Sequence, residues 1–306
     1  MSSSRNFRRS LEGQVGATVL TGFRRYLASL SPERVEDVGA QLGGLLYRVS
    51  RRHRERALTN LAMAYPELSS EPREDLARRV FAHYGRMTAD FLVSDRRTLA
   101  DVDVSLTVHG LENIERAREA GKGVLLVTGH YGNWERMSTW FAGHGYPLTV
   151  VARDTHNPRI NALLQELRTH AGTEVIPRGN AARPIIERLR RNELVGILPD
   201  QNSDEVFVPF FGQPAGTVLG PAVIAERTGA AVLLGGCAWV GPLRYEATFS
   251  APLEAVLGHS VKGEGMTIAI HAALEQMIRR HPEQWLWFHD RWKSARQRGL
   301  LKEETP

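Results

Sequence analysis

The sequence predicts an α/β fold with a mainly parallel central sheet flanked by helices and with an N-terminal helical layer. Two observations support this prediction. Residues 1–100 place apolar side chains at helical spacing and contain no convincing strand, whereas short apolar runs alternate with helical stretches from residue 101 onward. Buried strands separated by helices are typical of a parallel sheet with helices on its faces.

The length and composition fit one globular domain. The chain has 306 residues, of which 42% are hydrophobic, so it can bury a sizeable core. It contains no internal repeat, low-complexity tract or long linker. We therefore expect a single domain, 1–306, in which residues 1–100 form a helical and basic portion, 101–293 an α/β catalytic core and 294–306 a tail.

The helical portion carries a dense basic block. The segment RVSRRHRERALTNLAMAYPEL, residues 48–68, begins with arginines and continues as an apolar stripe. With 39 Lys and Arg against 34 Asp and Glu and a pI near 9.6, the chain suits anionic partners. The simplest explanation of the basic block is a solvated helix face, and the alternative is contact with headgroups or an acidic protein.

No early segment approaches the roughly 18–20 apolar residues that span a bilayer, and no signal peptide is evident. Apolar residues nevertheless recur every three or four positions at the N-terminus, flanked by arginines. They are Leu11, Val15, Val19, Phe23, Leu27 and Leu30. This pattern predicts a helix that lies in a membrane interface or one that packs on the protein's own core, and the pattern does not separate the two.

Strands and helices of the core follow in order. VDVSLTVHG (102–110) alternates like a half-buried strand, LENIERAREAGK (111–122) is a short helix and GVLLVTG (123–129) is a buried strand. The remaining strands are expected at 148–152, 174–176, 194–200, 231–237 and 245–249, and the remaining helices at 134–143, 158–171, 181–192, 221–228 and 267–280. The segment VPFFGQPAGTVLG (208–220) is expected to be a loop.

A histidine and a glutamate stand five positions apart where the strand 123–129 ends, in GHYGNWE. On a continuous helix, His130 and Glu135 would point about 140° apart, so they can cooperate only if the chain bends between them. Gly129 and Gly132 permit that bend, and Asn133 is a plausible N-cap for a helix that begins at Trp134. Ligands of open α/β sheets collect at such carboxyl ends of strands.

The chemistry of this pair suits proton transfer. An imidazole can take a proton from an alcohol, and a carboxylate on its other nitrogen fixes the tautomer. No protein nucleophile is needed if the substrate supplies the hydroxyl. A hydrolase would be expected to carry a G-x-S-x-G turn, which is missing. The same spacing recurs at His259 and Glu264, but there no buried strand precedes it.

These residues resemble a known family. GKGVLLVTGHYGNWE is similar to the HX4(D/E) signature of the late lipid A acyltransferases, the lauroyl and myristoyl transferases of the lysophospholipid acyltransferase superfamily. The likeness extends from RRHRERALTNLAMAYPEL through VHGLENI, VVARDTHNP, GILPDQN, VFVPFFG and AERTGA to PEQWLWFHDRWK. It covers most of the chain in the expected order.

The resemblance implies an enzyme that moves an acyl chain from an acyl carrier protein thioester, or from acyl-CoA, to a hydroxyl of a phosphorylated lipid A precursor. It implies no cofactor and a place at the cytoplasmic face of the bacterial inner membrane. The family usually begins with a more hydrophobic anchor helix, whereas the corresponding segment here is short, contains glycines and is flanked by arginines. We therefore expect peripheral or weak attachment to an anionic membrane surface.

The resemblance also implies roles for individual residues. His130 would be the general base and Glu135 its partner, Arg153 would bind phosphate or stabilise charge, and Asp200 would orient that arginine or the substrate. Tyr131 and Asn133 belong to the motif but could be packing and capping residues. The acyl region would include Val208, Pro209, Phe210 and Phe211, which could equally form a packed turn.

Other functions stay open at this point. The acceptor could be a phosphatidylinositol mannoside, a lysophospholipid or an aminolipid. Nucleic-acid binding would suit the arginines, but no helix-turn-helix, zinc-ligand or aromatic stacking pattern appears, so we expect no nucleic-acid partner. We expect no metal site, because ligand-spaced histidines and cysteines are missing. The single cysteine, Cys237, lies in an apolar run and is expected to be a buried thiol.

Overall fold

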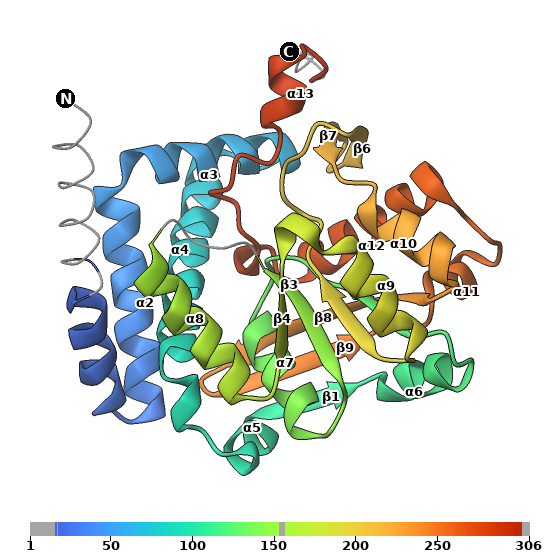
Figure 1. Cartoon of the computed structure of the whole chain (residues 1–306). Helices are drawn as coiled ribbons and strands as arrows, with labels where there is room; N and C mark the ends of the chain where they lie inside the picture. The colour runs from blue at the N-terminus through green and yellow to red at the C-terminus, as the bar shows by residue number, and fades with distance from the viewer. Residues whose placement is uncertain (1–15, 17, 153–156, 302–306) are drawn as a thin grey trace, which may run out of the picture.

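A seven-stranded sheet forms the centre of the computed structural model, which describes residue 16 and residues 18–152 and 157–301 (Figure 1). The strand order is β1-β9-β8-β2-β5-β3-β4. The block from β8 to β4 is parallel throughout, and β9 pairs antiparallel with β8 and parallel with β1. The predicted α/β class with a mainly parallel sheet is confirmed.

Helices and strands alternate along the core as the sequence predicts. The strands are β1 (Leu106–His109), β2 (Val124–Val127), β3 (Leu148–Ala152), β4 (Glu174–Pro177), β5 (Leu194–Ile197), β6 (Val206–Phe210), β7 (Gln213–Thr217), β8 (Ala231–Gly241) and β9 (Arg244–Phe249). The core helices are α5 (Leu99–Ser105), α6 (Leu111–Glu119), α7 (Trp134–Gly143), α8 (Pro158–His170), α9 (Ala182–Arg190), α10 (Gly220–Thr228), α11 (Leu253–Leu257), α12 (Gly263–Arg280) and α13 (Lys293–Gln297). Short 3₁₀ turns are η1 (Ser94–Arg96), η2 (Arg178–Asn180) and η3 (Pro282–Gln284).

Each face of the sheet has its own apolar core. Leu126 and Leu194 face α6 and α7, together with Ile114 and Phe141 of those helices. Side chains of the opposite face join α9, α10 and α12 in a second core, which also includes the tryptophans near the C-terminus. Because successive residues of a strand point to opposite faces, strands buried on both sides read as continuous apolar runs.

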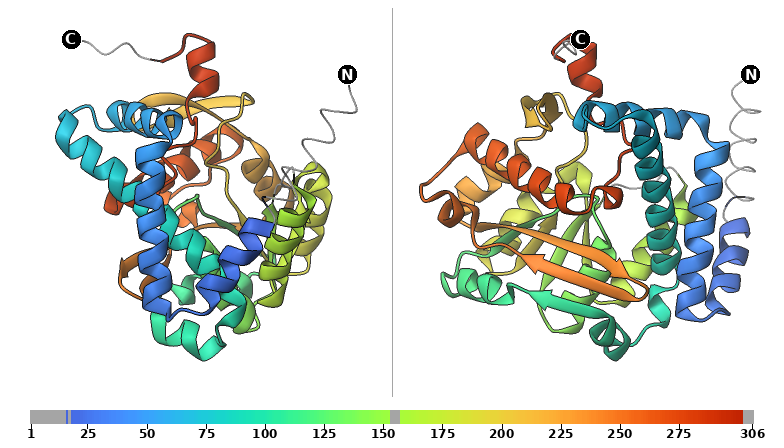
Figure 2. Two further views of the ribbon diagram at one scale, coloured as in Figure 1. Left: turned by 90° about the vertical axis from the view of Figure 1, so that its left-hand side faces the viewer. Right: turned by 180° about the vertical axis from the view of Figure 1, so that it is seen from behind.

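The N-terminal layer consists of α2 (Pro32–Val49), α3 (Arg51–Ala64) and α4 (Ser70–Leu92), which stand beside the sheet (Figures 1 and 2). α2 begins at Pro32 after the N-cap Ser31. Its contact with α4 is very close at two glycines: a Cβ on Gly43 would lie 1.9 Å from the carbonyl oxygen of Phe81, and one on Gly85 would lie 2.0 Å from that of Gly39. Only residues without side chains allow the two backbones to approach this far.

The predicted strand at residues 102–110 is wrong in its first half. Residues 99–105 form α5, and the strand β1 covers only Leu106–His109. A capping box explains the difference, since Thr98 accepts a hydrogen bond from the backbone of Asp101 while the Asp101 carboxylate accepts one from the backbone of Thr98. This reciprocal cap starts a helix that the alternating pattern does not reveal.

The predicted loop at residues 208–220 contains most of a β-hairpin. β6 and β7 pair antiparallel, with Phe210 opposite Gln213. The turn residues Phe211 and Gly212 have φ values of 50° and 73°. Two positive φ values in a two-residue turn match the right-handed twist of the strands and close the hairpin.

The N-terminal apolar pattern is described only in part. Residues 18–28 are helical, and Leu27 is fully buried against α2 and α4, with Phe23 and Leu30 packed beside it. Val19 is 65% exposed. Packing on the protein's own core thus accounts for the later half of the stripe, whereas Leu11 and Val15 lie outside the described residues.

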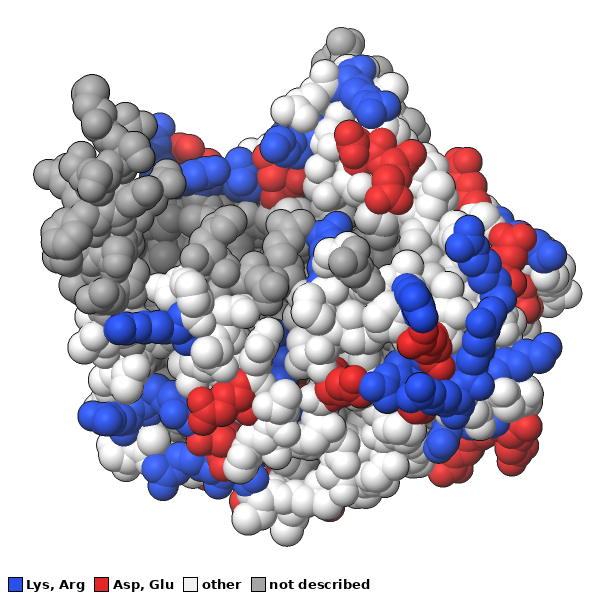
Figure 3. Space-filling model, in the orientation of Figure 1, with Lys and Arg blue, Asp and Glu red and all other residues white. Residues whose placement is uncertain are grey.

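Within the described residues, no helix is both long enough and apolar enough to cross a membrane. Basic and acidic side chains are interspersed over the face seen in Figure 3. Two arginines of the basic block are paired with the protein's own acids: Arg51 with Glu55 at 2.6 Å and Arg56 with Asp290 at 3.1 Å. The predicted buried thiol is confirmed: Cys237 is fully buried, and burial raises its pKa to about 12.

Candidate active site

His130 lies in the tight connection between β2 and α7, at the carboxyl end of the central strands. The chain is fixed directly after it. Gly132 has a φ of 58°, and a Cβ there would lie 1.9 Å from the carbonyl oxygen of Cys237 in β8. The neighbouring Tyr131 pairs its backbone with Trp285. This geometry places the imidazole at the rim of the sheet, as the glycines of the motif predict.

Asp200 holds the His130 ring. Its Oδ1 lies 2.8 Å from Nδ1 of His130, and its Oδ2 accepts hydrogen bonds from the His130 backbone N–H at 2.6 Å and from the Trp285 indole N–H at 2.8 Å. The Asp200 side chain is 1% exposed, whereas that of His130 is 23% exposed. A buried carboxylate therefore fixes an imidazole whose other edge reaches solvent.

The electrostatics of this pair favour an ionised Asp200. Burial alone would raise the pKa of the carboxyl, but the His130 ring, its backbone N–H and the Trp285 indole hold that pKa well below its ordinary value. A carboxylate on Nδ1 assigns the proton of a neutral ring to that nitrogen. Nε2 is then left with a lone pair that can accept a proton.

Nε2 of His130 faces polar and aromatic neighbours. The Gln201 amide nitrogen lies 3.3 Å from it. The ring of Trp134 packs edge to face on the imidazole, with 5.2 Å between the ring centroids. Both neighbours line the same cavity as His130.

The prediction that Glu135 is the hydrogen-bond partner of His130 is corrected by the geometry. Glu135 lies in the first turn of α7, from which its carboxylate reaches α8. Both Glu135 oxygens lie 3.1 Å from Nε of Arg168, and Oε1 lies 3.2 Å from the Trp134 indole nitrogen. The ion pair raises the pKa of Arg168, although burial opposes that rise. His130 and Glu135 nevertheless line one cavity.

Asn133 caps α7, as predicted. Its side-chain oxygen accepts a hydrogen bond from the backbone N–H of Arg136 at 3.0 Å, and its amide donates to Asp90 of α4 at 2.7 Å. Asp90 also accepts from Arg136 at 2.9 Å and pairs with Arg97. Burial would raise the pKa of Asp90, but the two arginines lower it.

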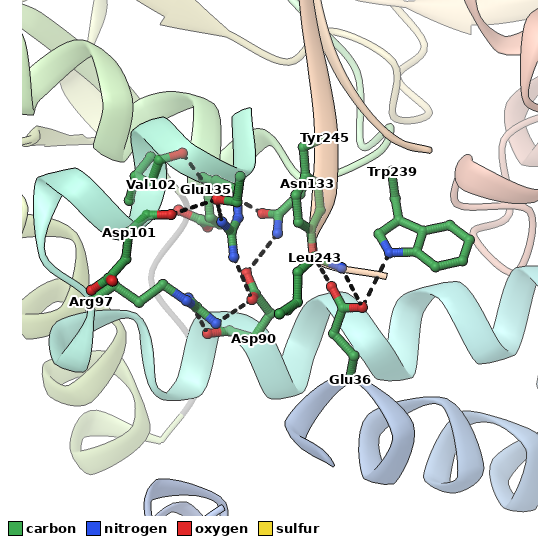
Figure 4. A network of polar contacts seen from close by, with 12 residues as sticks. Glu36, Asp90, Arg97, Asp101, Val102, Asn133, Glu135, Trp239, Leu243 and Tyr245 are labelled. Atoms are coloured by element: carbon green, nitrogen blue, oxygen red, sulfur yellow. Dashed lines mark hydrogen bonds and ion pairs between the residues drawn. The ribbon is translucent and has the colours of Figure 1, made fainter. Parts of the chain in front are cut away.

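Figure 4 shows this network beside a second one, in which Glu36 of α2 receives hydrogen bonds from Tyr245 at 2.6 Å and from Trp239 at 3.3 Å. Both networks join the N-terminal layer to the core. Neither Asp90 nor Glu36 lines the cavity that holds His130. Asn133 itself is 1% exposed and is not among the residues that line the cavity, so what the structure shows for it is the helix cap.

Tyr131 is 3% exposed and lies outside the wall of the cavity, so it serves in packing. A tyrosine that the sequence did not single out contacts the site instead: the hydroxyl of Tyr84 in α4 donates a hydrogen bond to the carbonyl oxygen of His130. Arg153 lies outside the described residues.

The candidate acyl region lies away from the wall of the cavity. Val208, Phe210 and Phe211 are buried in the hairpin, and Pro209 is exposed. Phe210 and Phe211 pack against the tryptophans Trp285, Trp287 and Trp292, with centroid distances from 5.3 to 6.4 Å. None of the four lines the cavity. They form the packed turn that the sequence left as the alternative.

The cavity measures about 730 Å³ and wraps around the carboxyl end of the central strands. On one face of the sheet it is walled by residues such as Leu126, Met137 and Leu148, which belong to the α7 side. On the other face its wall includes Ile185 and Ile224, from α9 and α10. Apolar walls with a few charged groups at one site are typical of small-molecule pockets.

The groups around the cavity suit proton transfer better than metal binding. In the part of the chain that the structure describes, no three His, Cys, Asp or Glu side chains gather so that they could hold a metal ion. Ser138 lines the cavity, but its hydroxyl lies 3.0 Å from that of Thr173 and has no histidine as a hydrogen-bond partner among the described residues.

The contributions of Arg168, Gln201 and Trp285 were not predicted. Arg168 stands in the last turn of a predicted helix, where a cation is common for reasons of helix stability alone, so the sequence carries no signal for its ion pair. Gln201 and Trp285 do lie within segments that resemble the family, GILPDQN and PEQWLWFHDRWK. The resemblance marked these segments without showing that they meet His130.

Comparison with known proteins identifies the family. The chain is 25% identical to a lipid A biosynthesis acyltransferase of Haemophilus influenzae over 270 residues, which cover 85% of this chain and 82% of that protein. It is 26% identical to the lipid A biosynthesis palmitoleoyltransferase of Escherichia coli, with 84% of each chain covered. It is also 28% identical to a phosphatidylinositol mannoside acyltransferase of Mycobacterium tuberculosis, with 69% of this chain and 67% of that protein covered.

The model of the bacterial lipid A biosynthesis acyltransferase family matches residues 7–294, nearly the whole chain. The resemblance found in the sequence is thereby confirmed, and the chain belongs to the bacterial lipid A biosynthesis acyltransferase family.

Proposed function

We propose that the protein transfers a fatty acyl group from an acyl carrier protein thioester to a hydroxyl of a phosphorylated lipid A precursor, with His130 as the general base. One observation supports this most directly: His130 is held by a buried carboxylate on Nδ1, while Nε2 lies at the wall of a cavity with apolar sides. Such a ring can act on a substrate hydroxyl without a protein nucleophile.

The reaction follows from this arrangement. Nε2 of His130 takes the proton of the acceptor hydroxyl as the hydroxyl oxygen attacks the thioester carbonyl carbon. Asp200 stabilises the resulting imidazolium through Nδ1. The carbon–sulfur bond then breaks, and the leaving sulfur takes the proton from Nε2. The products are an oxygen ester of the acceptor and a free thiol, so no cofactor is consumed.

Charged groups of the cavity suit a phosphorylated acceptor. Arg168 and Arg178 both line it, and Arg178 is exposed. Arginines recognise phosphate oxygens through fixed, planar arrays of donors. Because Arg168 is already paired with Glu135, we assign phosphate recognition to the exposed Arg178 and a positioning role in the cavity to the Glu135–Arg168 pair.

Activity measurements on the purified protein test this proposal. Acyl carrier protein and coenzyme A thioesters are supplied with a lipid A precursor, and the product is identified by mass spectrometry. We expect ester formation, and we expect His130→Ala to lower the rate by about 10²- to 10⁴-fold. His259→Ala is the matched control, because His259 also precedes a glutamate by five positions but is exposed outside the cavity. Unchanged transfer by His130→Ala would contradict the proposal.

A phosphatidylinositol mannoside is the second candidate acceptor. The relative from Mycobacterium tuberculosis named for that acceptor shares as much identity with this chain as the lipid A enzymes do. The same assay separates the two, because each acceptor gives a product of different mass. Transfer to the mannoside alone would replace the lipid A precursor in the proposal and leave the role of His130 intact.

We also propose that α2 attaches the protein to the cytoplasmic face of the inner membrane. Leu42, Leu45, Leu46 and Val49 are 41%, 52%, 45% and 69% exposed and recur at helical spacing, so they form one apolar stripe. Arg48 and Arg52 stand exposed at the end of this stripe, beside Arg51, which is exposed but paired with Glu55. An exposed apolar stripe beside arginines suits the interface of an anionic bilayer.

Cosedimentation with vesicles tests this attachment. We expect binding to vesicles that contain phosphatidylglycerol and weaker binding to phosphatidylcholine alone. Leu46→Glu should reduce binding, while Val104→Glu, on a side chain that is 92% exposed in α5, should not. Equal binding of both variants would rule out the α2 stripe as the attachment surface.

A further inference from the structure

Gly196 interrupts the side-chain layer of the central sheet. It lies in β5, between Leu126 of β2 and Val150 of β3 in the same register row. All three line the cavity. The other residues of β5 are Leu194, Val195 and Ile197, as expected for a buried parallel strand. Gly196 has no side chain, so the layer of side chains on this face of the sheet has a gap between Leu126 and Val150.

The backbone does not require a glycine at this position. Gly196 is not among the glycines with positive φ. A Cβ built there would lie 3.4 Å from Cγ1 of Val150 and 3.7 Å from Cδ1 of Leu148, which are ordinary contact distances. A glycine inside a strand costs stability and often marks a place where a ligand approaches closely. The structural consequence of Gly196 is therefore additional space in the cavity beside Val150 and Leu148.

That space has apolar walls. We define the sheet notch as the part of the cavity bounded by Leu126, Met137, Leu148, Val150 and Gly196. Leu126, Met137 and Leu148 are 1%, 4% and 4% exposed, so the notch is well enclosed. Three charged residues of the cavity, Arg168, Arg178 and Glu205, belong to other segments. The fourth, Glu135, stands in α7 like Met137, and its carboxylate is paired with Arg168. An apolar group without charge is the occupant that this surface favours.

The notch lies at a fixed position relative to His130. In β2 and its extension, Leu126 precedes His130 by four residues, which corresponds to at most about 13 Å along an extended strand. Thr128 lies between them and lines the same cavity. A chain whose carbonyl end lies at His130 can thus run past Thr128 into the notch, so an extended apolar chain fits better than a compact group.

We infer that the sheet notch receives the end of the transferred acyl chain and that Gly196 sets the longest chain the enzyme accepts. This inference rests on the proposed acyl transfer. A side chain at residue 196 would occupy the notch and shorten the space left for the chain. In a hydrophobic pocket, one methylene more or less typically changes specificity by about 10- to 200-fold.

The test compares Gly196→Ala and Gly196→Val with the unsubstituted protein. Each is supplied with saturated acyl carrier protein thioesters that differ in steps of two carbons, and kcat/KM is measured for each length. We expect the preferred length to become shorter, more so for valine, while the shorter thioesters react as before. Thermal unfolding shows that each variant is folded; Gly196→Ala carries the test if the valine variant is not.

Gly220→Ala is the matched control. Gly220 also lines the cavity, but it begins α10 on the opposite face of the sheet, and a Cβ there would have no atom within 4 Å. We expect its length preference to equal that of the unsubstituted protein.

Two results separate the two proposals. If the unsubstituted protein transfers acyl groups but the folded Gly196→Ala variant keeps the same length preference, the notch does not determine which chain lengths the enzyme accepts. If the unsubstituted protein transfers no acyl group of any length, the proposed function itself fails.

Discussion

Oδ1 of Asp200 lies 2.8 Å from Nδ1 of His130, although 70 positions separate the two residues in the sequence. The contact exists because β2 and β5 are neighbours in the sheet, so their carboxyl ends meet. The other carboxylate oxygen of Asp200, Oδ2, accepts hydrogen bonds from the His130 backbone N–H and from the Trp285 indole N–H. The orienting carboxylate thus belongs to a different strand from the motif that supplies the histidine.

Asp200→Asn should lower kcat for acyl transfer by about 10²- to 10⁴-fold, because an amide on Nδ1 no longer fixes the tautomer or stabilises the imidazolium. Steady-state kinetics measures this loss. The effects of substituting residues that act as one unit do not add. The double variant Asp200→Asn with His130→Ala should therefore be no slower than His130→Ala alone. A double variant slowed by the product of both single effects would show that the two residues act independently.

The ion pair between Glu135 and Arg168 should appear as a coupling free energy. Their side chains are 10% and 19% exposed, so solvent screens the pair only in part. We expect Glu135→Gln and Arg168→Gln each to lower the free energy of unfolding and the double variant to lose less than the sum, with a coupling of about 0.5–3 kcal/mol. Urea unfolding of the four proteins gives this value, and strict additivity would contradict the pair.

Two adjacent glycines of α2 should respond in opposite directions to alanine. Gly43→Ala places a Cβ against the backbone of Phe81 and should cost about 1–3 kcal/mol, because α2 must move away from α4. At Gly44 no atom lies within 4 Å of a Cβ, so Gly44→Ala should add about 0.5–1 kcal/mol through helix propensity. Urea unfolding distinguishes them. Equal changes in the free energy of unfolding for Gly43→Ala and Gly44→Ala would mean that the close packing of α2 on α4 is absent.

Stability should fall as the pH is lowered from 7 to 5. Burial lowers the pKa of His83 to about 3 and that of His271 to about 4, whereas both are near 6.5 in an unfolded chain. Below pH 6.5 the unfolded chain binds protons that the folded chain does not. At pH 5 each histidine should therefore reduce the free energy of unfolding by about 2 kcal/mol.

The measurement is urea unfolding at both pH values. The free energy of unfolding should differ less between pH 7 and pH 5 in His83→Leu than in the unsubstituted protein, by about 2 kcal/mol, the contribution expected from one histidine. A difference that is unchanged in this variant would show that His83 is not held neutral in the folded protein.

Features set by neighbouring residues could be predicted from the sequence. Asn133 and Trp134 mark the start of α7 because capping depends on a few adjacent positions. Likewise, Pro32 after Ser31 marks the start of α2. Local rules also explain two errors: the capping box at Thr98 overrides the alternating pattern of residues 102–105, and a phenylalanine with positive φ closes a hairpin where glycine or asparagine is usual.

The partners of the two site residues could not be predicted in the same way. Asp200 and His130 were each expected at the end of a strand, but their contact requires β5 beside β2, and the alternation of strands and helices does not fix that order. The ion pair of Glu135 depends on where α8 packs. A spacing of five residues within one motif invites the assumption of a local pair, whereas the fold pairs each member with a distant segment.

The helix α4 ties the site to the first hundred residues. Gly85 meets α2, Tyr84 donates to the His130 carbonyl, and Asp90 receives the amide of Asn133. A shortened chain that begins at residue 101 would lose all three contacts and leave Arg136 buried without its acid. The helical layer and the sheet therefore cannot be prepared as separate working halves, and a smaller version of this enzyme would have to keep α4 or rebuild its contacts.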